Sequence, residues 1–283
     1  MKRLIVFLSI IAGLSMLFPL NSTCKAEEGK KTTGSDSITI DEIVNRASHT
    51  AYYQAKDGRA VVSMVITDSQ GRTRKRRFTI LRLDQEAEDS MTKGTGEQKF
   101  YVYFKHPADV NKMAYLVNKH DDRDDDRWLY LPALDLVKRI AATDERTSFV
   151  GSDFFYEDVS GRGIFEDNHE LVETTGNYYV LKNTPKNPDE VEFTSFKMWI
   201  HKATFIPVKI VYFNKRGNKY REYKALKVDT IDGYPTVVQA EMRDLQTNNS
   251  TQVSYGKVEY NIGLPENIFT ERYLRNPPRK YIR

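Results

Sequence analysis

The densest group of side chains that can do chemistry is the stretch "HDDRDDDRW" from His120 to Trp128, which holds five aspartates and one histidine. Such a group suggests a metal site. A calcium loop, however, needs ligands at alternate positions, a glycine at its sharp turn and a later glutamate. Here Arg123 stands among the aspartates, and the stretch has no glycine. We therefore predict a solvated turn before a strand, because blocks of like charge usually face water, and we expect no metal.

A second candidate is "GSDFFYEDV" from Gly151 to Val159, in which aromatic rings stand beside carboxylates. Glu157 and Asp158 could serve as an acid and a base only if a substrate lay between them. No histidine has the H-E-x-x-H spacing of a zinc protease, and the serines lack the G-x-S-x-G pattern. The sequence thus predicts a protein that is not an enzyme and needs no cofactor.

The first residues predict export from the cytoplasm. Lys2 and Arg3 precede an apolar stretch over residues 4–20, and a polar segment with a suitable cleavage point after Ala26 follows. This is the pattern of a secretory signal peptide, which we assign to residues 1–26. It predicts a periplasmic protein.

Two alternatives remain open for this end of the chain. About 17 apolar residues are just enough for a membrane anchor, and Cys24 is a candidate for lipid attachment, although the residues before it fit that signal poorly. Residues 27–38 are polar and predict a flexible tether, and residues 39–283 then form a single domain. Cleavage leaves 40 basic residues against 39 acidic ones, a balance that excludes a typical nucleic-acid binder.

The rest of the chain predicts a β-rich domain with one N-terminal helix. Ile40, Ile43, Val44 and Ala47 recur at helical spacing, which indicates an amphipathic helix over about residues 40–55. The following segments alternate in the manner of strands and are separated by turn residues, first at 68–71 and later at 202–204, 216–218 and 246–249. About ten such strands predict an antiparallel meander that closes, or nearly closes, into a barrel.

The strand faces suggest where a ligand would lie. In "KFYVYFK" the residues Phe100, Val102 and Phe104 share one face, and in "FTSFKMWIHK" the residues Phe196, Met198 and Ile200 do. The opposite faces mix tyrosine and lysine with apolar residues. We predict a curved sheet with a dry concave side and a wet convex side. Its concavity is filled either by side chains or by an apolar ligand.

The stretch "GRTRKRRF", residues 71–78, places several cationic side chains on one hairpin. They could contact anionic lipid head groups or an acidic partner. They could equally protect an edge strand from pairing with another chain. The arginines concerned are Arg72, Arg74, Arg76 and Arg77.

Several runs together resemble the LolA-like family of outer-membrane lipoprotein-sorting proteins. They are "YVYFKHPADVNKMAYLV", "DDRWLYLPALDLVKRI", "FVGSDFFYEDV" and the ending "LPENIFTERYLRNP", and the resemblance spans about residues 40–277. It implies a mainly β fold, an incomplete antiparallel β-barrel of about eleven strands whose concave side is covered by a few helices. It also implies that an apolar cavity receives the acyl chains of lipids or lipoproteins and shields them from water.

The resemblance suggests roles for particular residues. Carriers of this fold use an arginine on an early strand to hold a lid shut, and the four hairpin arginines lie in that region. We interpret residues 151–159 as part of a lid or rim, in which Ser152 and Asp153 cap a short helical turn holding Phe154 and Phe155. The candidate wall and rim residues are Phe100, Val102, Phe104, Trp128, Tyr130, Phe154, Phe155, Phe196, Met198 and Ile200.

The expected function is that of a periplasmic carrier of lipid or lipidated cargo towards the outer membrane. The partners are lipid or lipoprotein acyl chains, a membrane contacted transiently, and an inner-membrane export pump that hands over the cargo. The alternative is a lipid-sensing or adaptor protein that regulates a membrane protein. A hydrolase on the same fold would need polar groups that converge inside the cavity.

Overall fold

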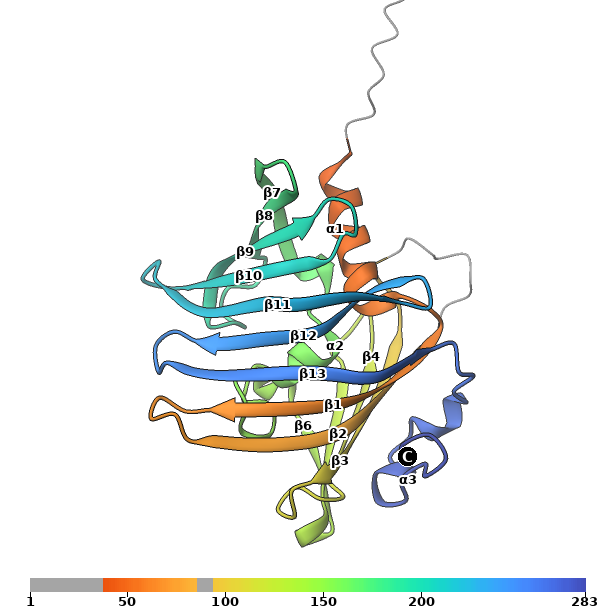
Figure 1. Cartoon of the computed structure of the whole chain (residues 1–283). Helices are drawn as coiled ribbons and strands as arrows, with labels where there is room; N and C mark the ends of the chain where they lie inside the picture. Colours follow the sequence, from red (N-terminus) through yellow and green to blue (C-terminus); the bar gives the residue numbers. More distant parts are fainter. Residues whose placement is uncertain (1–37, 86–93) are drawn as a thin grey trace, which may run out of the picture. The chain divides into compact units, whose positions relative to one another are not determined.

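The computed structural model describes residues 38–85 and 94–283, which fold around one antiparallel sheet of thirteen strands (Figure 1). The predicted signal peptide, Cys24 and the tether up to residue 37 lie outside the described residues. Within the described part, no helix is both long and apolar enough to span a membrane.

The strands follow one another along the chain, each pairing with its predecessor, except where the chain passes from β6 to β7. The sheet is completed by pairing of the first strand with the last, so that β6 and β7 become its two edges. The strands are β1 (Asp57–Thr67), β2 (Thr73–Asp84), β3 (Gln98–His106), β4 (Ala114–Lys119), β5 (Asp126–Leu131), β6 (Leu136–Ile140), β7 (Asp167–Thr174), β8 (Tyr178–Pro185), β9 (Phe193–His201), β10 (Pro207–Asn214), β11 (Lys219–Ile231), β12 (Tyr234–Asp244) and β13 (Asn249–Tyr260).

In the described part of the chain, three α-helices accompany the sheet, namely α1 (Ile40–Ser48), α2 (Tyr156–Ser160) and α3 (Arg272–Arg275). A π-helical turn, His49–Tyr53, extends α1, so that the two together match the helix predicted over about residues 40–55. The side chain of Thr39 caps α1 by accepting a hydrogen bond from the backbone N–H of Glu42 at 3.1 Å. The sheet curls around α1 and α2, which lie on its concave side (Figure 1).

The concave face carries the main core. Phe100, Val102 and Phe104 of β3 are almost fully buried there, together with apolar side chains from β1, β2, β4, β12 and β13. Phe149, from the segment before α2, packs edge-on against Phe78 and Tyr156 and so joins that segment to the sheet. The predicted dry concave face is therefore present.

The prediction of a wet convex face is wrong over β2 to β5. The C-terminal segment after β13 folds back over this face and buries Tyr101 and Leu116 beneath Phe269 and Leu274. The hydroxyl group of Tyr101 donates a hydrogen bond to the carbonyl oxygen of Tyr273 at 2.7 Å. Tyr101 is therefore buried beneath the apolar C-terminal segment instead of facing water.

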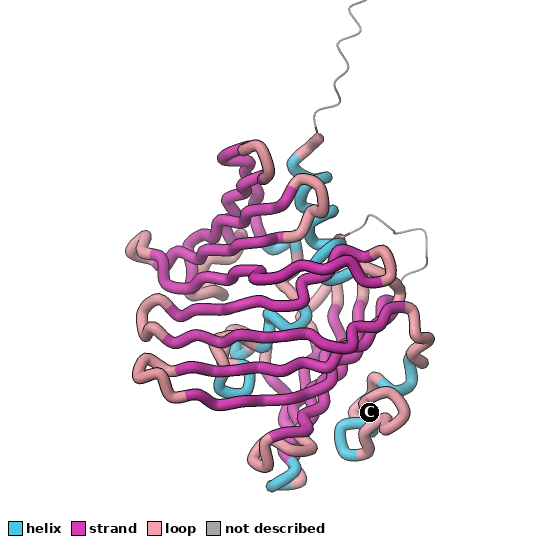
Figure 2. Tube along the Cα trace, in the orientation of Figure 1, coloured by secondary structure: helices cyan, strands magenta, loops and turns pink. Residues whose placement is uncertain are grey.

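The mainly β, LolA-like fold class is confirmed, but there are more strands than predicted (Figure 2). The alternation found about ten and the resemblance implied about eleven. The segments missed are β6, β7 and β8. Strands β6 and β7 are edge strands, largely exposed on both faces, so their sequences lack the regular apolar alternation of a half-buried strand.

Candidate binding cavity on the concave face

A cavity of about 390 Å³ lies between the concave face and the segments that cover it. Its wall is mostly apolar and comes from β1 to β3 and from β7 to β13. The apolar wall residues include Ala60, Met64, Phe78, Ile80, Phe100, Val102, Leu181, Met198, Ile210, Val237, Met242 and Val253. Ala51 and Tyr52 of the π-helical turn, with Val159 of α2, face them from the covering side. The volume falls within the range of ligand pockets, roughly 300 to 1,000 Å³.

Five of the ten predicted wall and rim residues line this cavity, namely Phe100, Val102, Phe154, Phe196 and Met198. Phe104 and Ile200 lie on the same side but are fully buried in the core next to the cavity. The other three lie elsewhere, and each departs from the prediction for a specific reason.

Trp128 and Tyr130 were placed on the wrong face. They share one face of β5 and pack on the convex side among residues of the C-terminal segment, whereas their neighbours Leu129 and Leu131 point into the concave core. The alternation had been assigned correctly, but it does not tell which face is concave. Phe155 does not line the cavity, because its ring packs against Arg221, whose guanidinium carbon lies 3.8 Å from the ring centre.

The helical turn predicted within residues 151–159 begins later than expected. Helix α2 starts at Tyr156, and the carboxylate of Asp158 accepts a hydrogen bond from the backbone N–H of Phe155 at 2.6 Å. Asp153 instead accepts a hydrogen bond from the Thr251 hydroxyl at 2.6 Å and so ties the loop to β13. These carboxylates act as anchors, as expected, but the capping residue is Asp158.

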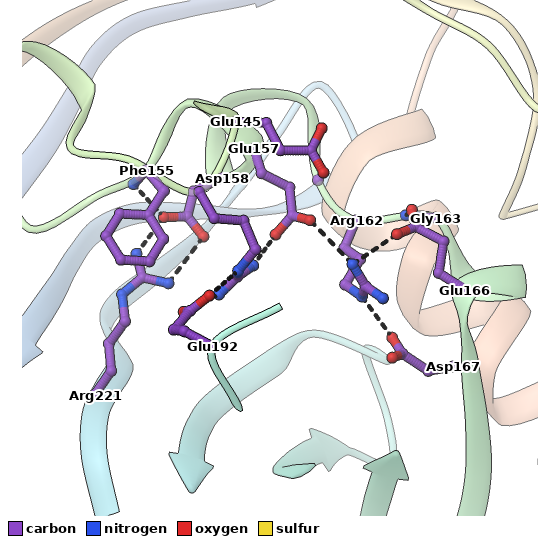
Figure 3. A network of polar contacts seen from close by, with 12 residues as sticks. Glu145, Phe155, Glu157, Asp158, Arg162, Gly163, Glu166, Asp167, Glu192 and Arg221 are labelled. Atoms are coloured by element: carbon purple, nitrogen blue, oxygen red, sulfur yellow. Dashed lines mark hydrogen bonds and ion pairs between the residues drawn. The ribbon is translucent and has the colours of Figure 1, made fainter. Parts of the chain in front are cut away.

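A network of buried ion pairs holds α2 in place (Figure 3). Glu157 is 3% exposed and accepts hydrogen bonds from both Arg146 and Arg162. Arg146 also forms a bidentate ion pair with Glu192, with hydrogen bonds of 2.7 and 2.8 Å, which links the segment before α2 to the start of β9. Breaking such a pair by removing one partner leaves an uncompensated buried charge, which is costly.

A second anchor joins α2 to β11. Arg221 is 2% exposed and pairs with Asp158 (Figure 3). It also donates a hydrogen bond to the carbonyl oxygen of Asp153 at 2.9 Å. Further along the network, burial opposes the charge of Arg162, but Asp167 and Glu157 outweigh it and raise the pKa of that guanidinium. The arginines of this network therefore remain charged and paired.

Lys119 connects the two covering helices. Its ammonium group donates hydrogen bonds to the carbonyl oxygens of Ser160 and Gly161, at 3.0 and 2.9 Å, and lies 5.7 Å from the ring centres of Tyr52 and Tyr53. Gly161 has a φ of +77°, and a Cβ atom there would lie 2.5 Å from the Tyr52 ring. Glycine is therefore required where the end of α2 meets the π-helical turn.

Arg82, near the end of β2, anchors the other side of the cover. Its guanidinium donates hydrogen bonds to the carbonyl oxygens of Tyr52, Gln54 and Ala55, the last at 2.6 Å, and pairs with Asp84 at 3.2 Å. The carbonyl groups at the end of a helix have no partner within the helix. Arg82 supplies that partner and fixes the end of the α1 segment to the sheet.

Of the four hairpin arginines proposed as lid contacts, only Arg74 reaches the cover, by donating a hydrogen bond to the Gly151 carbonyl oxygen at 3.1 Å. Arg72 pairs with Asp68 in its own turn, and Arg76 pairs with Asp109. Arg77 is exposed. The principal contacts belong to Arg82 and Arg221, which sequence reasoning did not select.

The aspartate-rich stretch forms a turn before β5, as predicted, but it is not freely solvated. Arg127 is buried and pairs with Asp125 at 2.8 Å and Glu145 at 2.6 Å, while Asp126 pairs with Arg123 at 3.1 Å. The carboxylates therefore anchor the loop through arginines. No group of three or more histidine, cysteine, aspartate or glutamate side chains in the described parts of the chain is arranged to hold a metal ion.

Comparison with known proteins agrees with this architecture. A family model described as "Uncharacterized protein" matches residues 96–276, well over half of the chain. The chain belongs to this family. Among solved structures, it is similar to a DUF1329 family protein from Desulfovibrio piger, with 25% identity, a TM-score of 0.73, and coverage of 84% of this chain and 100% of that one.

Two further structures carry the same fold. A putative outer membrane lipoprotein-sorting protein domain from Vibrio parahaemolyticus shows 27% identity and a TM-score of 0.72 over 83% of this chain and 97% of its own. A LolA superfamily protein from Nitrosomonas europaea shows 18% identity and a TM-score of 0.64 over 84% of this chain and 100% of its own. The predicted resemblance to LolA-like lipoprotein-sorting proteins is confirmed. No curated protein matches the chain.

Proposed function

We propose that this protein is a periplasmic carrier that binds the acyl chain of a lipid or lipidated cargo in the concave cavity. The observation that carries the proposal is the cavity itself, about 390 Å³ lined chiefly by apolar side chains of the sheet and covered by α1 and α2. An apolar hollow of this kind, rimmed by a few polar groups, is typical of a ligand site. The likeness to a putative lipoprotein-sorting domain supports acylated cargo.

The hydrophobic driving force for acyl-chain binding is of the same size as the cost of association. Burying a C16 acyl chain contributes about 12 kcal/mol at roughly 0.8 kcal/mol for each CH₂ group. Association itself costs on the order of 4 to 15 kcal/mol in lost freedom. The balance corresponds to binding that is reversible, which a carrier needs in order to release its cargo. Handover from an inner-membrane export pump belongs to the same proposal.

The test is native mass spectrometry of residues 27–283, purified from periplasm without detergent. We expect additional bound mass that solvent extraction identifies as lipid, and the same mass shift after delipidated protein is incubated with phospholipid or lipopeptide. A clean mass that stays unchanged after incubation with phospholipid, fatty acid and lipopeptide would overturn the proposal. In that case the cavity does not accept acyl chains, and binding to a membrane-protein partner becomes the better explanation.

A further inference from the structure

The cavity wall carries tyrosine hydroxyl groups, which the binding of a purely apolar ligand does not require. Tyr52 of the π-helical turn, Tyr223 of β11 and Tyr255 of β13 all line it, and we call these three residues the tyrosine cluster. Within residues 38–85 and 94–283, no hydrogen-bond partner is present for any of their three hydroxyl groups. By contrast, Tyr260 also lines the cavity, but its hydroxyl lies 2.8 Å from that of Thr236.

The three residues line the same cavity, Tyr52 from its covering side and Tyr223 and Tyr255 from the sheet. Burial raises the pKa of Tyr52, and the Asp158 carboxylate and the phenols of Tyr212, Tyr223 and Tyr255 raise it further. Asp158 likewise adds to the effect of burial at Tyr255, whose pKa rises to about 12. Burial also raises the pKa of Tyr223. All three hydroxyls therefore stay protonated and can act as hydrogen-bond donors.

The charges around the cavity limit what these donors can bind. The cavity wall has guanidinium groups from Arg59, Arg82 and Arg162, and each is already paired. Their partners are Glu259 at 2.8 Å, Asp84 at 3.2 Å and Asp167 at 3.0 Å, respectively. A buried carboxylate or phosphate needs a cationic partner. A neutral acceptor does not, and the Asp158 carboxylate does not repel it.

We propose that the tyrosine cluster binds the neutral ester or amide carbonyl of an acylated ligand, so that the cavity selects esterified or amidated acyl groups over free fatty acids. The acyl chain then occupies the apolar part of the cavity, and the carbonyl oxygen accepts hydrogen bonds from the hydroxyls. The inference rests on the proposed function and specifies its substrate class. An apolar ligand that covers these hydroxyls leaves them unpaired, which is unfavourable, so the carbonyl gains selectivity as well as affinity.

The test compares three ligands of equal chain length, methyl laurate, laurate and dodecane, by displacement of the neutral probe N-phenyl-1-naphthylamine at pH 8. The proteins are the wild type, Tyr223→Phe, Tyr255→Phe and the double variant. The control is Tyr103→Phe, because Tyr103 lies on the opposite face of the sheet beneath the C-terminal segment. Thermal unfolding of each variant shows that the fold is retained.

We expect the wild type to bind methyl laurate more tightly than laurate or dodecane. Each single variant should weaken ester binding about 2- to 13-fold, which corresponds to the loss of one net hydrogen bond of about 0.5 to 1.5 kcal/mol. Dodecane affinity should not fall in any variant, and Tyr103→Phe should behave as the wild type. With ester labelled by ¹³C at the carbonyl, the infrared carbonyl band should lie at lower frequency in the wild type than in the double variant.

Failure of this inference differs from failure of the carrier proposal. If the wild type binds the ester no better than dodecane, or if the double variant keeps full ester affinity, the tyrosine cluster does not bind the carbonyl. The cavity would in that case still accept acyl chains. If none of the three ligands displaces the probe, acyl binding itself is overturned. If the ester is preferred, a lysophospholipid and a diacylated cysteinyl peptide, which both carry ester carbonyls, are compared next. The favoured cargo is the one that binds the wild type more tightly and loses affinity in the double variant.

Discussion

Arg82 offers the most direct test of how the cavity is closed. Replacing it by methionine keeps the apolar stem of the side chain and removes the guanidinium that binds the carbonyl oxygens of Tyr52, Gln54 and Ala55. We expect Arg82→Met to release the α1 segment from the sheet while the strands remain paired. The variant should therefore lose protection locally before it loses stability throughout.

The magnitude follows from the contacts. A hydrogen bond from a charged donor contributes about 1.5 to 3 kcal/mol, so the lower value gives about 4.5 kcal/mol for three. The side chain is 12% exposed, and water reaches some of the released carbonyl groups, which reduces the expected loss to about 3 kcal/mol. Because each 1.4 kcal/mol is a factor of ten, amide exchange in the helix should accelerate on the order of 100-fold.

Hydrogen exchange read by mass spectrometry over residues 40–55 measures this opening directly. The matched control is Arg72→Met, because Arg72 is 74% exposed and pairs only with Asp68 in the hairpin turn. Removing such a surface pair should leave stability nearly unchanged. Arg82→Lys should restore little, because an ammonium group lacks the planar fork that reaches three carbonyls. Exchange over residues 40–55 that matches the wild type in Arg82→Met would refute the reasoning.

Three further outcomes are expected. Burial alone would raise the pKa of Glu192, but hydrogen bonds from Arg146 and Tyr220 outweigh it and lower the pKa to about 2 from its ordinary 4.5. The stability from this group is therefore present above about pH 4.5 and is lost as the pH falls towards 2, so Glu192→Gln should flatten the fall of Tm across that window; an unchanged slope contradicts this. Ala60→Phe places a ring in the cavity and should abolish bound lipid mass in native mass spectrometry, at a cost in unfolding free energy of no more than about 3 kcal/mol; retained lipid would show that acyl chains bind elsewhere. Phe269→Ala should cost about 3 to 5 kcal/mol in chemical denaturation, because the ring is 1% exposed under the convex face, yet leave ligand binding intact; a loss of lipid without a loss of stability would contradict this assignment.

The sequence was most informative where one local rule decides the structure. The α1 helix follows from its apolar spacing and from Thr39, and the turn at residues 68–71 follows from its polar residues and glycine. The edge strands β6 and β7 could not be found in this way, because both faces of these strands are largely exposed and their sequences show no apolar alternation. An alternating pattern reveals a strand only where one of its faces is buried.

The site was less accessible to sequence reasoning, since its geometry depends on contacts between distant segments. Trp128 and Tyr130 were assigned to the cavity although they lie beneath the C-terminal segment, because no local pattern indicates which face that segment covers. Arg82 stands in the strand "FTILRLD" on the same face as Phe78 and Ile80. A charge that follows apolar residues on one face is a signal that it has a specific partner, and it is the clue that would have singled out Arg82.

The two covering helices differ in how firmly they are held, and this difference indicates where the cavity opens. Helix α2 is fixed by several buried charges, among them the pair between Asp158 and Arg221 and the hydrogen bonds from Lys119. The α1 segment is held by a short apolar stripe, by Arg82 and by neutral hydrogen bonds, such as that from the Gln98 amide to the Tyr52 carbonyl oxygen at 2.8 Å. Opening at α1 leaves fewer buried charges without partners and is therefore the less costly movement.

That movement has a consequence for ligand recognition, because Tyr52 belongs to the α1 segment whereas Tyr223 and Tyr255 belong to the sheet. A carbonyl that accepts hydrogen bonds from both sides joins the cover to the wall, so ester binding and closure of the cavity stabilise each other. Methyl laurate should therefore slow amide exchange over residues 40–55 more than dodecane does at equal saturation. Equal slowing by both ligands would show that closure follows from filling the cavity alone, and that the hydroxyl of Tyr52 takes no part in it.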